Sequence, residues 1–177
     1  MNFRCTALFF CIVFIGWTLP AGTKHKPLED VKAEVSAAFN SACEKLLIDN
    51  ISKAGKTIYA AVYTFAKKSI ADALIERAEH GVKISLKLDA VQAEFSYTKF
   101  LIKRMESAGI LIQLITMKKK GSHMHHKFAV IDGKTTVTGS FNWTRSATEF
   151  NNENIISVTS DEIAEAYMNE WNEIGKH

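Results

Sequence analysis

The 177-residue sequence has few of the residues that mark specialised architectures. It holds only two prolines and three cysteines, and no low-complexity tract or internal repeat interrupts it. Cys5 and Cys11 lie in an apolar N-terminal stretch, so Cys43 alone remains for the rest of the chain. One cysteine can form neither an intramolecular disulfide nor a zinc site built from cysteines. We expect Cys43 to be a buried core residue on a helix.

An excess of one charge is also lacking. The chain has 22 Lys and Arg residues against 19 Asp and Glu residues, which gives a net charge of +3. This excess favours a polyanionic partner only weakly and does not define a function by itself. The length suits one domain with a sizeable core.

Residues 1–22 form an apolar stretch in which Arg4 is the only charged side chain. A basic start, an apolar middle and small residues at the exit predict a secretory signal peptide, and hence a secreted or periplasmic protein. An uncleaved membrane anchor is the alternative, because the run is just long enough to span a bilayer. Membrane association would then follow.

Strand and helix patterns alternate as far as residue 116. Apolar periodicity predicts four strands, at residues 31–39, 58–65, 82–88 and 110–116. Helices are predicted between them, the first two behind capping boxes that begin at Ser41 and Ser69 and the third at residues 96–108, each stopped by a glycine. This order predicts a mixed, largely parallel sheet with helices on both faces.

The C-terminal third departs from this alternation. After a basic loop at residues 118–122, two strands are predicted around a tight Asp132-Gly133 turn, and residues 141–152 look like a polar loop. A last strand and a helix behind Ser160-Asp161 complete the chain. We expect one α/β domain over residues 28–175, with no internal boundary. The two strands of the hairpin are predicted at 125–131 and 134–139, the last strand at 153–159, and the buried stripe of the helix at Ile163, Tyr167, Trp171 and Ile174.

Reactive side chains concentrate in HMHHKFAVIDGKTTVTGSFNWT, residues 123–144. Alternate side chains of a strand share a face, so His125 and Lys127 point one way and His126 the other. Open α/β sheets usually place their sites at strand ends, where the hairpin and the next strand would gather further polar groups. The predicted site comprises His125, Lys127, Asp132, Ser140, Asn142 and Glu153.

This set of side chains suits phosphate chemistry. A neutral histidine can attack phosphorus or move a proton, and a lysine binds phosphate oxygens as a point charge. Ser140 and Asn142 can donate hydrogen bonds as charge builds on those oxygens. Glu153 is the candidate carboxylate for the far ring nitrogen of His125, where it would fix the tautomer and support the imidazolium.

The pattern His125-x-Lys127-x4-Asp132, followed by Gly139-Ser140-x-Asn142, resembles the HKD signature of the phospholipase D superfamily. The small, single-motif bacterial endonucleases of that superfamily are the most similar, over most of residues 31–171. The resemblance implies that one histidine forms a covalent phosphohistidine while a second protonates the leaving oxygen and then activates water. Because the chain has one motif, the resemblance also implies a twofold homodimer whose subunits share one site.

We therefore expect a phosphodiesterase that needs no metal or other cofactor, and most simply a nonspecific endonuclease that cleaves DNA or RNA. Lys118, Lys119 and Lys120 are expected to bind the nucleic-acid backbone, and Trp143 to stack on bases unless it lies in the core. A phospholipase D that acts on phospholipid is one alternative. A non-catalytic nucleic-acid-binding protein on the same fold is another.

Other roles for these residues stay open. The histidine cluster could bind a metal ion, although no cluster of acidic residues accompanies it. Asp132 could simply pin the turn, and Ser140 and Asn142 could stabilise their loop. We expect His126 to be a packing residue and His123 a loop residue.

Overall fold

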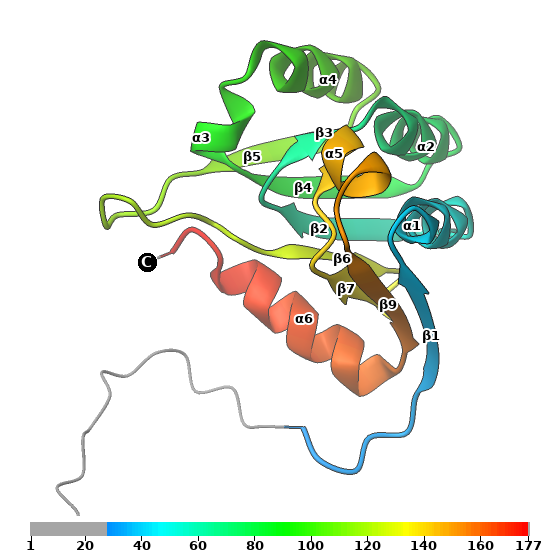
Figure 1. Ribbon diagram of the computed structural model, residues 1–177. Coiled ribbons are helices and arrows are strands. Elements are labelled where there is room, and N and C mark those ends of the chain that lie inside the picture. Colours follow the sequence, from blue (N-terminus) through cyan, green and yellow to red (C-terminus); the bar gives the residue numbers. More distant parts are fainter. Residues whose placement is uncertain (1–27, 177) are drawn as a thin grey trace, which may run out of the picture.

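The computed structural model describes residues 28–176 and shows a central sheet between two layers of helices (Figure 1). The predicted leader, residues 1–22, lies outside the described residues. The sheet contains β1 (Glu34–Phe39), β2 (Thr57–Val62), β4 (Lys83–Asp89), β5 (Leu111–Ile115), β6 (Lys127–Ile131), β7 (Thr135–Gly139) and β9 (Asn154–Thr159), and β3 (Phe65–Ala66) pairs separately with β8 (Trp143–Thr144). The helices are α1 (Ala42–Ser52), α2 (Lys68–Glu79), α3 (Ala90–Ala93), α4 (Ser96–Ser107), α5 (Arg145–Glu149) and α6 (Asp161–Glu173). No helix within the described residues is long and apolar enough to cross a membrane.

The strands of the large sheet follow the order β1-β9-β7-β6-β2-β4-β5. The mixed α/β class is confirmed, but the expectation of a largely parallel sheet is wrong: β2-β4 and β4-β5 are parallel, and the other four neighbouring pairs are antiparallel. The antiparallel pairs arise because one edge of β2 pairs with β4 and the β6-β7 hairpin occupies the other edge. Strand β1 therefore pairs with β9 at the far edge instead of extending the parallel set.

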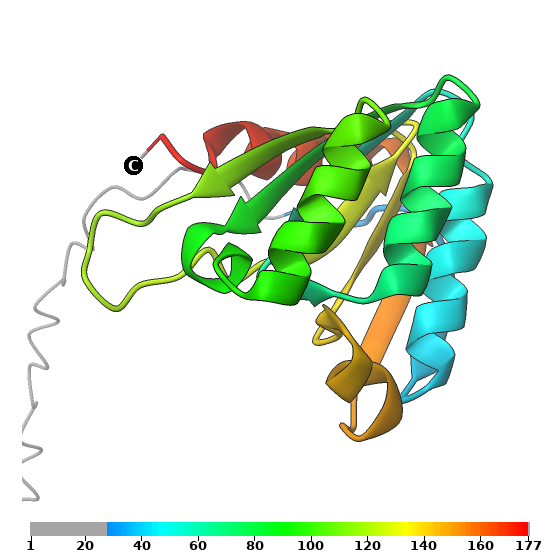
Figure 2. The same ribbon diagram turned by 90° about the horizontal axis from the view of Figure 1, so that it is seen from above.

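Helices pack on both faces of the sheet, as predicted. Figure 2 shows α1, α2 and α4 side by side on one face and α6 on the other. The first layer buries side chains such as Leu47, Leu74 and Leu101, and the second packs α6 against Phe128 and Val130. Apolar burial on both faces of the central strands is the main stabilising term of this architecture.

Neither of the two predicted capping boxes, at Ser41 and Ser69, forms a cap, whereas the helix predicted behind Ser160 is capped. Ser160 caps α6 by accepting the backbone N–H of Ile163 at 3.4 Å. Ser41 precedes α1 but makes no side-chain cap bond. Glu44 instead accepts a hydrogen bond from Ser69, which lies inside α2, so the residues of the two predicted boxes join α1 to α2.

The expected polar loop at residues 141–152 contains the short elements β8 and α5. Thr144 starts α5 by accepting the backbone N–H of Ala147 at 3.2 Å. Trp143 pairs with Phe65, and their ring centroids lie 5.5 Å apart in the core. Cys43 is fully buried on α1, as predicted.

Candidate active site

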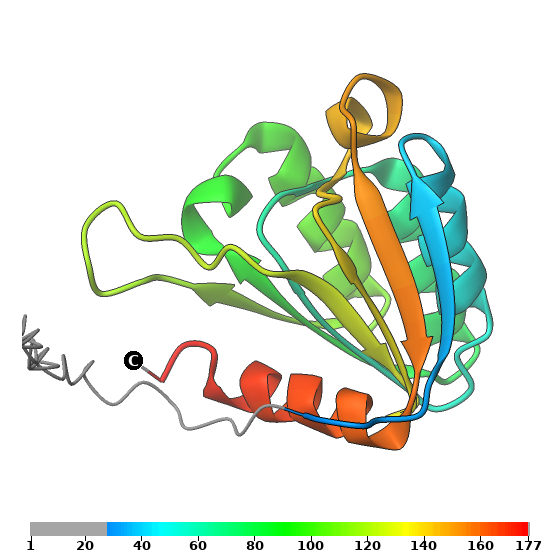
Figure 3. The same cartoon turned by 60° about the horizontal axis from the view of Figure 1, so that its bottom comes forward.

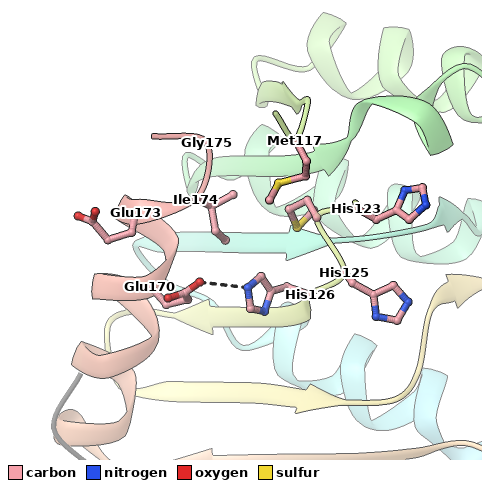
Figure 4. Close-up of a pocket in the computed structure, with 9 residues that line it drawn as sticks. Met117, His123, His125, His126, Glu170, Glu173, Ile174 and Gly175 are labelled. Carbon is pink, nitrogen blue, oxygen red and sulfur yellow. Dashed lines mark hydrogen bonds and ion pairs between the residues drawn. The ribbon is translucent and has the colours of Figure 1, made fainter. Parts of the chain in front are cut away.

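His125 and Lys127 lie side by side where the loop after β5 enters β6. Strand β6 begins at Lys127. His125 therefore precedes the strand, although the prediction placed it inside. The Nζ atom of Lys127 lies 3.2 Å from Nδ1 and 3.3 Å from Nε2 of His125, and it donates to the His125 carbonyl oxygen at 2.8 Å. His126 extends to the other side, where its Nε2 lies 3.1 Å from Glu170 on α6 (Figure 4). A histidine and a cation are thus held together at the exposed end of the strand.

Tyr63 completes this centre, and sequence reasoning did not identify it as a site residue. It follows β2, whose last residue pairs with Lys127, and its N–H donates to the carbonyl of His126 at 2.7 Å. Its ring centroid lies 4.5 Å from that of His125 and 5.1 Å from Nζ of Lys127. Within the apolar run at residues 58–65, nothing distinguishes this tyrosine from core aromatics. Only the pairing of β2 with β6 brings it to the histidine.

The surroundings favour the uncharged form of His125. Desolvation by neighbouring protein atoms lowers the pKa of His125, and the Lys127 ammonium lowers it further, against an opposing effect of Asp89. Burial also lowers the pKa of Lys127, and the Glu153 carboxylate opposes this shift. A neutral imidazole has a free lone pair, so the arrangement suits nucleophilic attack on phosphorus.

Ser140 and Glu153 contact each other rather than His125. Ser140 Oγ donates to Glu153 Oε2, and Asn151 Nδ2 donates to Glu153 Oε1 at 3.0 Å. The prediction that Glu153 binds the far ring nitrogen of His125 is therefore wrong for a single chain. The reason is topological: β7 lies between β6 and β9, so Glu153, at the start of β9, is separated from His125 by a strand. Its negative charge nevertheless opposes the lowering of the Lys127 pKa by burial.

Asn142 and Trp143 follow Ser140 and differ in burial. The side-chain oxygen of Asn142 is buried and has no hydrogen-bond partner within residues 28–176. Trp143 is 1% exposed, so the expectation that it stacks on a substrate is wrong. The pairing of β3 with β8 places this ring in the core.

Asp132 lies far from the other predicted residues. It follows the last residue of β6, at the end of the strand opposite Lys127. Its carboxylate accepts the backbone N–H groups of Gly55, Lys56 and Thr57, each at 2.8 Å. The expectation that Asp132 belongs to the catalytic set is therefore wrong, and the structural alternative holds. Strand β6 rises by about 3.3 Å per residue, which separates the two ends of the motif by well over 10 Å.

Comparison of the sequence with models of known protein families identifies the family of this chain. The family described as "Cardiolipin synthase, PLD-like domain" matches residues 47–174. The chain belongs to the phospholipase D superfamily. A protein of Rickettsia bellii named phospholipase D is 31% identical over 160 residues, which cover 89% of this chain and 77% of the relative. The mitochondrial cardiolipin hydrolase of Chlamydomonas reinhardtii is 32% identical over 127 residues, and this chain covers only 55% of its length.

Two solved structures share the fold. The phospholipase D family member Nuc from Salmonella typhimurium superposes with a TM-score of 0.76 at 22% identity, over 81% of this chain and 94% of that one. NucT from Helicobacter pylori superposes with a TM-score of 0.73, also at 22% identity, over 81% and 96%. These superpositions confirm the mixed α/β single domain, and the match of the family model confirms the predicted resemblance.

Two hollows open beside the phospholipase D-like motif, and both have His125 and His126 in their walls. One runs along α6 to Glu173 (Figure 4), and the other reaches Thr138 and Tyr167. Substrate can therefore approach the histidine and the lysine directly from solvent. Within residues 28–176, no group of three or more His, Cys, Asp or Glu side chains is arranged to hold a metal ion.

The predicted basic loop leads directly into this centre. Lys118, Lys119 and Lys120 are exposed in the segment between β5 and β6 that also carries the histidines. Their role in binding a substrate stays a prediction.

Proposed function

We propose that this member of the phospholipase D superfamily cleaves the phosphodiester bonds of nucleic acids, without a metal ion, through a covalent phosphohistidine on His125. The observation that carries the proposal is the Lys127 ammonium within 3.3 Å of both ring nitrogens of His125. A phosphate drawn to this ammonium lies beside a neutral imidazole, the group that attacks phosphorus. The ammonium then stabilises the negative charge that builds on the phosphate oxygens.

The reaction has two steps. A ring nitrogen of His125 bonds to phosphorus as the bond from phosphorus to the leaving oxygen breaks, and that oxygen takes a proton. Water then attacks the phosphohistidine, gives up a proton, and releases the phosphate and the free imidazole. Both steps need an acid or base opposite the nucleophile, and a second histidine suits this role. We propose that His125 of a second copy supplies it.

The uncovered surface of the sheet supports a second copy. Strands β1 and β9 extend beyond α6 (Figure 3), and they leave Val35 and Phe39 61% and 63% exposed. Ile156 is the third large apolar side chain of this surface, at 38% exposure. Exposed apolar groups gathered on one face mark contact surfaces in soluble proteins.

This surface is continuous with the reactive centre. Cross-strand pairing aligns Phe128, Thr138, Ile156 and Ala37 in one row across β6, β7, β9 and β1. Thr138 also lines the hollow that contains His125. A twofold contact over this surface would therefore adjoin the motif of each copy, as a shared site requires.

The exposed lysines on the loop before His125 support nucleic acid as the substrate, because nonspecific binding to nucleic acid is mostly electrostatic attraction to its backbone. Phospholipid is the second candidate. It is supported by the names of the relatives, phospholipase D and cardiolipin hydrolase, and its cleavage would use the same groups.

The test is to incubate the protein in EDTA with plasmid DNA, RNA, or vesicles of phosphatidylcholine or cardiolipin, each separately. We expect cleavage of nucleic acid, and the His125→Ala variant should lose at least about 10³-fold in rate. The variant should keep DNA binding that weakens with salt, because the basic loop is intact. Cleavage of lipid alone would replace the proposal with the second candidate, and an undiminished His125→Ala enzyme would refute the mechanism.

A further inference from the structure

His123 is a member of the histidine cluster to which the proposed reaction gives no role. Its side chain is 38% exposed, and its Nδ1 lies 3.7 Å from the carboxylate of Asp89. Figure 4 shows His123 and His125 extending to the same side of the loop, away from His126. The His123 ring therefore lies on the same side of the loop as the proposed nucleophile and next to a carboxylate (Figure 4).

Asp89 is fixed in place beneath His123. It is 2% exposed at the end of β4, and it accepts the N–H groups of Val91 and Gln92 at 3.1 Å and of Met124 at 3.0 Å. The bond to Met124 ties the loop to the sheet between the two histidines. The Asp89 carboxylate therefore has a fixed position beside the His123 ring.

Tyr63 brings His123 and His125 to a common point. Its ring centroid lies 5.4 Å from that of His123 and 4.5 Å from that of His125. The two imidazoles therefore border the same tyrosine, with the Lys127 ammonium over its ring at 5.1 Å. A phosphate group beside the neutral His125 and the Lys127 ammonium therefore has His123 as a further neighbour on the same tyrosine.

We propose that His123 is a phosphate-binding residue of this site, whose imidazolium, oriented by Asp89, contacts the same phosphodiester group that His125 attacks. This inference rests on the proposed function and adds His123 to the residues of the proposed site. In its protonated form, His123 also balances the negative charge of the buried Asp89 carboxylate, which by itself would repel the phosphate.

The inference makes substrate binding depend on pH, because histidine changes its charge between about pH 5 and pH 8. As pH rises, the imidazolium is lost and the Asp89 carboxylate is left unbalanced, so the affinity for phosphate falls. The charged and titratable groups around His123 are Asp89 at the end of β4, Tyr63 after β2, His125, His126, Lys127 and residues 118–120 on its own segment, and Glu170 and Glu173 across the hollow on α6.

Steady-state hydrolysis of bis(4-nitrophenyl) phosphate tests the inference, because this diester has a single phosphate and no base or lipid tail. His123→Ala should raise KM about 10-fold at about pH 6, the loss of one charge-assisted hydrogen bond, and much less at about pH 8. Its kcat should stay within about twofold of the wild type, because the nucleophile is intact. His123→Lys carries a permanent charge and should keep KM low at both pH values.

His80→Ala is the matched control. His80 is a histidine at the C-terminal end of α2 whose ring contacts the carbonyl of Glu76 at 2.7 Å, and its replacement should change neither constant. An unchanged KM for His123→Ala at about pH 6 would refute the inference, as would an equal increase at both pH values, which indicates a structural role. A loss of kcat as large as that of His125→Ala would also refute it, since His123 would then be catalytic.

Inorganic phosphate separates this inference from the proposed function. Its titration into wild type and His123→Ala, followed by the NMR signals of the imidazoles, needs no turnover. Weaker phosphate binding by the variant at about pH 6 supports the inference even if no diester is cleaved, and equal binding refutes it. A wild-type enzyme that cleaves no diester refutes the proposed function alone.

Discussion

Lys127 and Asp132 belong to one sequence motif, yet they lie at opposite ends of strand β6. Lys127 pairs with Val62 at the C-terminal end of β2, and Asp132 binds the backbone of residues 55–57 at its N-terminal end. The motif therefore has a chemical end and an anchoring end, and the strand between them fixes the register of β6 on β2. The two ends should respond differently to substitution.

Replacement of Asp132 should affect stability and leave catalysis intact. Asp132→Ala removes the acceptor of three backbone N–H groups and places alanine at a φ of 54°, so we expect a loss of roughly 3 kcal/mol in the free energy of unfolding. Asp132→Asn should lose less, because asparagine keeps one acceptor oxygen and tolerates a positive φ. Urea unfolding measures both, and kcat/KM of the folded fraction should match the wild type. A large loss of kcat/KM without a loss of stability would return Asp132 to the catalytic set.

The stabilisation by Asp132 should also depend on pH. Burial alone would raise the pKa of Asp132, but the three N–H donors hold it below its ordinary value. The contribution of Asp132 to the free energy of unfolding is therefore complete above the pKa of an aspartate in the unfolded chain, about 3.9. It is lost as the pH falls through the lower pKa of Asp132 in the folded protein. The difference in stability between wild type and Asp132→Ala should narrow below about pH 4.

Lys127→Gln should change both the rate and the pH profile. Without the ammonium, phosphate oxygens lose their stabilising charge, and kcat/KM should fall about 10²- to 10³-fold. His125 attacks in its neutral form, so activity is present above its folded pKa. Desolvation and Lys127 both lower that pKa, and removal of Lys127 raises it again, so the acid limb of the profile should move to higher pH.

Lys134→Gln is the control for this variant, because Lys134 is an exposed lysine at the anchoring end of the hairpin. Lys134→Gln should change neither kcat/KM nor the acid limb of the pH profile. A Lys127→Gln enzyme with an unmoved acid limb would show that the lysine acts on the phosphate alone.

Phe39→Glu should disrupt the proposed contact between two copies. It places a carboxylate on the apolar surface of β1, where Phe39 is 63% exposed, and we expect monomers that have lost at least about 10²-fold in rate. Leu111→Glu is matched to it, since Leu111 is 70% exposed on β5, the opposite edge strand. That variant should stay dimeric and active. Light scattering combined with turnover measures both, and a fully active monomer would show that one chain completes the site.

Much of this protein follows from its sequence, where local rules suffice. Apolar periodicity located most strands and helices, and Gly81 and Gly109 end α2 and α4 with positive φ, as a helix-stopping glycine should. The expected separation of His125 from His126 is correct although both precede β6 (Figure 4), and the spacing of the motif indicated the superfamily that residues 47–174 match. The predictions of a leader and of a secreted or periplasmic enzyme depend on residues 1–22 alone.

Tertiary structure decided what each motif residue contacts. Asp132 binds backbone groups 75 to 77 positions away, Trp143 packs on Phe65, and β7 separates Glu153 from His125. Tyr63 and Asp89, which flank the histidines, come from the ends of strands that carry no motif. Periodicity gives the face on which a side chain lies, because the backbone repeat is local. It does not give the neighbouring strand, which depends on pairings between distant segments, and in this protein those pairings assemble the site.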